Sequence, residues 1–234
     1  MVAQNPTCGG RVVTSPAREA DHVRRIQRDY GRWARLYDWF ARATAGVGGV
    51  RAGCVEALDL DPGDTVVEFG CGPGVNLPAL REQVGDSGQV VGVDVTRPML
   101  DRARGLVARR GWENVSLVHG DATAPPISHA DAVLATFVTS LFPDPYAVVS
   151  GWCALADRVV SANFAPRGNR AANAALWLFT QVNPPLFDSL RRDTLGQLDR
   201  RTGATQRALA DAMGRLESER YVFGTVTVSV GQRA

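Results

Sequence analysis

The sequence predicts an α/β protein built on a doubly wound, mostly parallel sheet that ends in an antiparallel strand and carries a helical N-terminal cap. Three observations lead to this prediction. Short valine-rich runs recur through the middle of the chain, and helix-like segments separate them, which is typical of a parallel sheet covered on both faces. A glycine-rich turn follows the first of these runs. An alternating apolar run lies near the C-terminal end.

The valine-rich runs are short enough to be buried strands. We predict parallel strands at 65–69, 89–94, 115–121, 131–138 and 157–164. The segment TRPMLDRARGLVARRG shows how the connecting helices are marked: Thr96 is the predicted N-cap, Pro98 lies in the first turn, and Gly111 ends the helix. Over 219–232, Gly224 separates two β-rich runs, which predicts a hairpin-like pair of strands at the end of the sheet.

Length and composition favour one domain. With 234 residues, of which 45% are hydrophobic and 21% charged, the chain is long enough for one sizeable core. We predict a flexible tail at 1–19 and a single domain at 20–234. The predicted parts of that domain are a helical cap at 20–58, a ligand-binding core at 64–165, a helical segment on the substrate side at 166–215 and a terminal strand pair at 217–231.

Cysteine usage and hydropathy bear on location. The four cysteines lie far apart, with no C-x-x-C pair and no histidine at metal-ligand spacing, at Cys8, Cys54, Cys71 and Cys153. Reduced thiols in a cytosolic protein fit this pattern, and we predict no metal site. The first 19 residues hold no apolar signal core, and no window reaches 18 uninterrupted apolar residues. We therefore expect a cytoplasmic protein, with peripheral contact at the inner membrane surface left open.

The charged residues narrow the choice of ligand. All 26 basic residues are arginines. Without lysine, the chain has neither a P-loop of the G-K-[ST] type nor an amine that could form a Schiff base. The charge is uneven, because residues 59–130 hold six arginines against ten acids. Such an acidic segment favours a cationic ligand over a polyphosphate.

The segment VVEFGCGPGVNLPAL contains the most informative motif. It places an acid and three glycines at alternate positions: Glu68, Gly70, Gly72 and Gly74. A nicotinamide or flavin fingerprint, G-x-G-x-x-G, would need glycine or alanine where this chain has Val75. The remaining pattern, E-x-G-x-G-x-G, predicts a loop whose backbone, free of side chains at the glycines, lies against a ligand other than a nicotinamide or flavin dinucleotide.

Acidic residues follow three of the predicted strands. Glu68 ends the first strand, Asp94 ends the second, and Asp121 closes the third. Each could be only a helix cap or a turn former. Ligands of parallel sheets bind at the carboxyl ends of the strands, however, so the three acids together predict a binding edge.

Four motifs carry a resemblance to a known family. They are VVEFGCGPGVNLPAL, VVGVDVTRPML, VHGDATAPPI and DAVLATFVTSLFPDPYAVV. In this order and spacing, over about residues 64–165, they resemble the class I S-adenosylmethionine-dependent methyltransferases. The resemblance implies a Rossmann-like sheet of seven strands, S-adenosylmethionine as cofactor and S-adenosylhomocysteine as product.

The resemblance also implies roles for individual residues. The glycine loop would let the backbone approach the cofactor, Asp94 would bind both ribose hydroxyls, and Asp121 would recognise the adenine amino group. Charge-assisted hydrogen bonds from hydroxyls and amines to carboxylates agree with these roles. The full set of implied cofactor-binding residues is Glu68, Gly70, Cys71, Gly72, Gly74, Asn76, Asp94, Val95, Met99, Asp121, Ala122 and Phe137.

Two further segments bear on the acceptor. YGRWARLYDWF at 30–40, with VTSLFPDP after the fourth predicted strand, is similar to ubiquinone and menaquinone methyltransferases and to phospholipid N-methyltransferases, which act on lipid-like acceptors. The apolar segment 169–192, flanked by arginines, resembles a helix that lies on an anionic surface. Both could instead be structural helices that cover the core. The residues that we predict for an acceptor site or a lid are Tyr30, Trp33, Tyr37, Trp177 and Phe179.

The sequence does not choose a catalytic base. Methyl transfer depends mainly on positioning and desolvation, so no general base is obligatory, and His22, His119 and His129 remain candidates. We expect a small hydrophobic or lipid-like acceptor, whose methylated atom could be carbon, nitrogen or oxygen. Two alternatives stay open: a methyltransferase acting on RNA or a soluble metabolite, and a non-catalytic protein that binds S-adenosylmethionine. DNA is not an expected partner, and the oligomeric state is undetermined.

Overall fold

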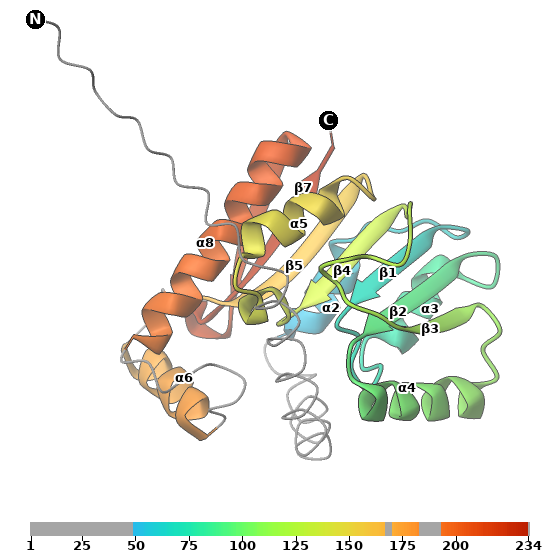
Figure 1. Cartoon of the computed structure of the whole chain (residues 1–234), viewed down its shortest axis with the longest axis horizontal. Helices are drawn as coiled ribbons and strands as arrows, with labels where there is room; N and C mark the ends of the chain where they lie inside the picture. The colour runs from blue at the N-terminus through green and yellow to red at the C-terminus, as the bar shows by residue number, and fades with distance from the viewer. Residues whose placement is uncertain (1–48, 167–169, 183–192, 234) are drawn as a thin grey trace, which may run out of the picture.

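The computed structural model describes residues 49–166, 170–182 and 193–233, and these build one seven-stranded sheet (Figure 1). The strands lie in the order β3-β2-β1-β4-β5-β7-β6. Their bounds are β1 Thr65–Phe69, β2 Gln89–Asp94, β3 Val115–His119, β4 Ala132–Thr136, β5 Arg158–Phe164, β6 Arg215–Tyr221 and β7 Val226–Gln232. Strands β1 to β5 are parallel to one another, whereas β7 is antiparallel to both β5 and β6. The predicted doubly wound sheet with a terminal antiparallel strand is therefore confirmed, whereas the predicted tail at 1–19 and residues 20–48 of the predicted helical cap lie outside the described residues.

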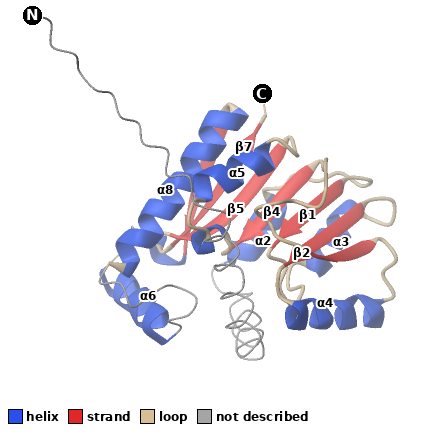
Figure 2. Ribbon diagram, viewed as in Figure 1, coloured by secondary structure: helices blue, strands red, loops and turns tan. Residues whose placement is uncertain are grey.

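Helices cover both faces of the sheet, as Figure 2 shows by colour. Their bounds are α2 Val50–Glu56, α3 Leu77–Val84, α4 Arg97–Arg110, α5 Pro145–Cys153, α6 Arg170–Val182 and α8 Thr194–Met213, with short 3₁₀ turns η2 Thr139–Leu141 and η3 Val222–Gly224. Apolar side chains of α2, α3 and α4 pack into one core, and those of α5 and α8 pack into a second. Adjacent residues of β1 point to opposite cores: Val66 to the first and Val67 to the second.

The chain reverses direction across the sheet between β1 and β4. From β1 it proceeds through β2 to β3 at one edge, and it then returns to β4 and continues to β5 on the other side. This arrangement makes the β1–β4 boundary the topological switch point, where α/β sheets bind ligands outside the carboxyl ends of their strands. A ligand is therefore expected to bind at the loops after β1, β2, β3 and β4.

Some predicted boundaries need correction. Strand β3 ends at His119 rather than at residue 121, and β6 begins at Arg215, two residues before the predicted strand pair. Thr96 is the N-cap of α4 as predicted, but its side chain makes no capping hydrogen bond. Gly111 ends α4 in the left-handed conformation, with φ 65°, as a C-cap glycine does.

Candidate functional site

The glycine loop joins β1 to α3 in a conformation that suits glycine. Gly70, Gly72 and Gly74 have φ values of 70°, 55° and 85°, in the left-handed region that other residues rarely adopt. A Cβ atom at Gly72 would meet no atom within 4 Å, whereas one at Gly74 would lie 2.7 Å from Leu77 and 3.3 Å from Ala103. Gly72 therefore presents bare backbone to open space, and Gly74 permits close packing of the helices behind the loop.

Asp94 joins the end of β2 to this loop. Its Oδ2 atom accepts a hydrogen bond of 2.9 Å from the backbone N–H of Gly72, and its Oδ1 atom accepts one of 2.8 Å from the N–H of Thr96. Burial raises the pKa of Asp94, although these two hydrogen bonds act in the opposite direction. An ionised carboxylate offers about four acceptor positions, so Asp94 keeps capacity for two hydroxyl groups.

Asp121 and Ala122 follow β3 at the same edge. The N–H of Gly120 donates to the backbone oxygen of Asp94 at 3.1 Å, which ties this turn to the end of β2. Asp121 is half-buried and accepts a 2.9 Å hydrogen bond from the N–H of Thr123. The indole N–H of Trp152 on α5 donates to the Ala122 carbonyl at 2.8 Å. Trp152 thus fixes the position of the turn, a role that no sequence motif predicted.

A buried polar cluster lies beneath the glycine loop. Glu68 is 1% exposed, and its Oε1 atom accepts a 2.6 Å hydrogen bond from Asn76, whereas Oε2 has no partner. Asn76 also donates to the Thr136 hydroxyl at 3.2 Å. Arg51 donates to Asn76 Oδ1 at 3.0 Å and to Thr136 Oγ1 at 3.3 Å. The structure therefore adds Thr136 and Arg51 to the predicted site residues Glu68 and Asn76.

Phe137 lies directly after β4 at the switch point. Its φ of 62° is unusual for an aromatic residue, and such backbone conformations concentrate at functional sites. Its ring packs against Phe164, the last residue of β5, with ring centroids 4.7 Å apart. The Arg51 guanidinium lies over the Phe137 ring, 5.8 Å from its centroid. These contacts fix the predicted site residue Phe137 between the polar cluster and the end of β5.

The remaining predicted residues differ in their exposure. Met99 and Cys71 are buried, and Val95 is half-buried. Burial raises the pKa of the Cys71 thiol well above its usual range, so this sulfur is not poised as a nucleophile. Trp177 is 50% exposed on α6. Tyr30, Trp33, Tyr37 and His22 lie outside the described residues, as does the side chain of Phe179.

The two described histidines are exposed. A ring nitrogen of His119 lies 3.0 Å from the Val95 carbonyl oxygen, and His129 lies in the loop before β4. Neither contacts the polar cluster through a described hydrogen bond. Within the residues that the structure describes, no group of histidine, cysteine or acidic side chains could hold a metal ion.

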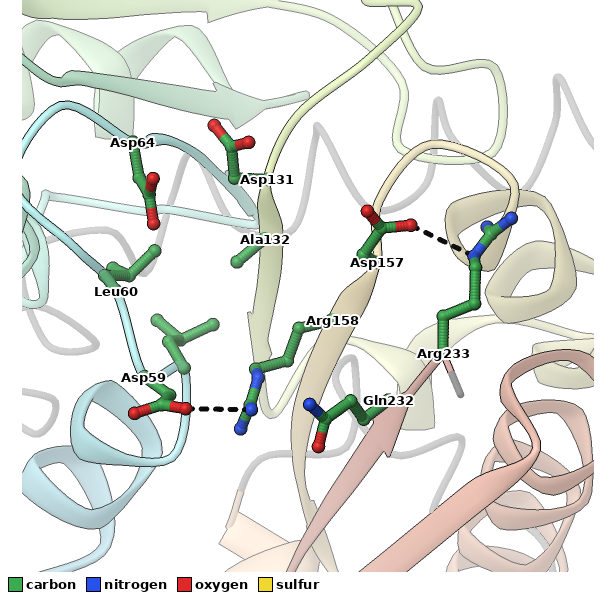
Figure 3. Close-up of a pocket in the computed structure, with 10 residues that line it drawn as sticks. Asp59, Leu60, Asp64, Asp131, Ala132, Asp157, Arg158, Gln232 and Arg233 are labelled. Carbon is green, nitrogen blue, oxygen red and sulfur yellow. Dashed lines mark hydrogen bonds and ion pairs between the residues drawn. The ribbon is translucent and has the colours of Figure 1, made fainter.

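A shallow pocket of about 210 Å³ lies at the opposite edge of the sheet (Figure 3). Ala132 at the amino end of β4 lines it, together with two ion pairs: Arg158 with Asp59 at 3.0 Å, and Arg233 with Asp157 at 3.1 Å. Because both of its arginines are paired with carboxylates and the parallel strands β4 and β5 begin rather than end there, we assign this pocket no part in the site around the glycine loop.

The carboxyl-end site fits the cofactor implied by the resemblance. The bare backbone at Gly72 gives access to a ligand, and Asp94 beside it has free acceptor positions for hydroxyl groups. The sheet order, the glycine loop after β1 and the acids after β2 and β3 together define a class I S-adenosylmethionine-dependent methyltransferase fold.

Comparisons with known proteins agree with this assignment of the fold. Residues 66–156 match a family described as a methyltransferase domain. Nocamycin O-methyltransferase of Saccharothrix syringae is 34% identical over 67% of this chain and 50% of that protein. Demethylmenaquinone methyltransferase of Shouchella clausii is 34% identical over 45% of this chain and 46% of that protein. The chain thus spans about half the length of the curated relatives that it matches.

A solved structure supports the same fold. Magnesium protoporphyrin IX methyltransferase from Synechocystis PCC 6803, solved with bound S-adenosylmethionine, has a TM-score of 0.52 and 19% identity, covering 80% of this chain and 77% of that chain. At this identity the likeness concerns the fold. Residues 66–156 therefore match the methyltransferase-domain family, and the sheet has the class I methyltransferase fold.

The buried Glu68 carboxyl should make the stability of the fold depend on pH. Burial raises its pKa to about 8 from an ordinary value of 4.5. Between these values the folded state holds a proton that the unfolded state has lost, so the free energy of unfolding falls as pH rises. Glu68→Gln removes this titration. We therefore expect the difference in melting temperature, Glu68→Gln minus the original protein, to increase by several degrees between pH 5 and pH 8. Above pH 8 the difference should level off. A difference that stays constant with pH in calorimetric scans would contradict this account.

Proposed function

We propose that the protein transfers the methyl group of S-adenosylmethionine to a small hydrophobic or lipid-like acceptor. The sulfonium would supply the methyl group, and the protein would position the acceptor and exclude water. The observation that supports the acceptor class is a series of apolar side chains that runs from the switch point to exposed residues of α6. It begins at the Phe137 and Phe164 rings, which pack together at the carboxyl ends of β4 and β5.

The series of apolar side chains continues onto α6. Phe164 packs against the cluster formed by Leu176 of α6 and Leu198 of α8. The next two residues of α6, Trp177 and Leu178, are 50% and 59% exposed. Large apolar side chains exposed beside a site often mark a binding surface.

A second exposed aromatic residue lies near the same end of β5. The backbone N–H of Ala165 donates to Thr225 at 2.8 Å, which brings the turn before β7 to the end of β5. In this turn Phe223 is 82% exposed, and both Val222 and Phe223 have positive φ, at 50° and 55°. Strained backbone that presents an exposed aromatic side chain supports a role in binding an apolar group.

The relatives differ in their acceptors, as the words O-methyltransferase and demethylmenaquinone in their names indicate. Neither acceptor is transferred to this chain. Peripheral membrane contact also stays a proposal, although no helix among the described residues has the length and hydropathy needed to cross a bilayer.

Trp177→Ala tests the acceptor surface. If Trp177 contacts the acceptor, its truncation removes apolar contact worth about 1–2 kcal/mol, so the KM for a hydrophobic acceptor should rise roughly tenfold. Cofactor affinity should stay unchanged. Activity is measured with S-adenosylmethionine against a quinol, a phospholipid in vesicles and a soluble amine or phenol. Full activity on the soluble compounds alone would overturn the hydrophobic-acceptor proposal, and failure to methylate any of them would favour the non-catalytic alternative.

A further inference from the structure

Arg51 lies at the switch point, although it belongs to a helix that precedes the whole sheet. It is the second residue of α2, and its Nη1 group donates to Asn76 on the glycine-loop side and to Thr136 at the end of β4. Its guanidinium also lies over the Phe137 ring. Three segments that are far apart in the sequence, α2, the glycine loop and the end of β4, therefore place one cation at the carboxyl edge.

The hydrogen bonds fix the orientation of this cluster. Arginine can only donate, so the Asn76 side-chain oxygen must face Arg51 and its NH₂ group must face Glu68. The pKa of Glu68 is raised to about 8, and the carboxyl is therefore mainly protonated at neutral pH. Consequently Glu68 does not neutralise Arg51.

Arg51 retains unused donors. Its described hydrogen bonds all come from Nη1, which leaves Nη2 and Nε without a partner among the described residues. No ion pair joins it to a carboxylate of that part of the chain. Its two remaining donor groups can engage a carboxylate as a planar fork, the geometry that arginine prefers.

The order of the strands indicates which part of the cofactor Arg51 meets. The turn after β3 carries Asp121 and the end of β2 carries Asp94, so adenine and ribose would lie over these two strands. The next positions along the sheet are β1 and β4, where Arg51, Asn76 and Thr136 meet. The portion of the cofactor beyond the ribose is methionine, which carries a carboxylate.

We propose that Arg51 binds the carboxylate of the methionine portion of S-adenosylmethionine. Asn76 and Thr136 act as positioning residues that hold the guanidinium, and Glu68 acts through Asn76. This inference rests on the cofactor of the proposed function and is independent of the acceptor.

The test compares two ligands by calorimetry on the full chain. S-adenosylhomocysteine has the carboxylate, whereas 5′-methylthioadenosine keeps the adenosine and the sulfur but lacks the amino-acid portion. Arg51→Gln should weaken binding of S-adenosylhomocysteine about 10- to 100-fold and change binding of 5′-methylthioadenosine less than about twofold. Arg104→Gln serves as a matched control, because Arg104 pairs with Asp101 on the surface of α4, and it should affect neither ligand.

The possible results separate this inference from the proposed function. Equal losses for both ligands, or no loss for either, would overturn the role of Arg51 while leaving the methyltransferase proposal intact. If the unsubstituted protein binds neither ligand, both proposals fail. Should Arg51→Gln melt at a much lower temperature, Arg51→Lys replaces it: the charge is kept but the fork is lost, so selective weakening of S-adenosylhomocysteine is still expected.

Discussion

Replacing Gly72 with valine should abolish S-adenosylmethionine binding while leaving most of the fold in place. The added side chain would enter the open space in front of the loop, where a Cβ atom meets no protein atom within 4 Å. The backbone φ of 55° adds a cost of about 1–2 kcal/mol for a residue with a Cβ atom, and more for a β-branched one. Calorimetry measures the loss of binding, and circular dichroism measures the retained fold.

Gly74→Ala provides the contrasting control. Its Cβ atom would approach Leu77 to 2.7 Å and Ala103 to 3.3 Å, so the strain falls on packing between α3 and α4 rather than on the ligand. We expect a lower melting temperature for this variant. A folded Gly72→Val variant with normal affinity would show that the loop is only a turn and would remove the main support for the site.

The parallel part of the fold was predictable because its sequence pattern has a direct physical cause. Strands buried on both faces must be apolar at nearly every position, and β4 is buried throughout. The positions of Glu68, Asp94 and Asp121 followed from the same reasoning, since the carboxyl ends of parallel strands meet at one edge. The order of the last two strands was not predictable, because the alternation of β7 is equally consistent with pairing to either neighbour.

The site residues that sequence reasoning missed depend on tertiary contacts. Nothing local marks Arg51, which is one of nine arginines in residues 1–58, and only folding brings it to Asn76 and Thr136. From the sequence, Trp152 likewise looks like an ordinary core residue, although its indole N–H donates a hydrogen bond to the Ala122 carbonyl. The positive φ of Phe137 has no signature in the sequence, because such strain is imposed by surrounding structure.

Asp94→Ala should lower the affinity for S-adenosylmethionine and S-adenosylhomocysteine by at least ~10-fold, since hydrogen bonds to a charged group contribute about 1.5–3 kcal/mol each. The structure adds a second cause: the same carboxylate accepts the N–H groups of Gly72 and Thr96, so its removal also releases the glycine loop. Asp94→Asn separates the two causes. It keeps the size of the side chain and one oxygen acceptor but loses the charge, so we expect intermediate affinity.

The pH dependence of binding tests the same residue independently. Burial raises the pKa of Asp94, so the carboxylate takes up a proton at a higher pH than an exposed aspartate would. Protonation removes acceptor capacity, and affinity for S-adenosylhomocysteine should therefore fall on acidification in the original protein more steeply than in Asp94→Asn, which cannot titrate there. Titrations with NAD should show no binding at any pH, because Val75 occupies the position where a dinucleotide fingerprint has glycine or alanine. Unchanged affinity in Asp94→Ala, or NAD binding that competes with S-adenosylhomocysteine, would remove Asp94 from the ribose site, and the acid after β2 would then serve only to hold the glycine loop.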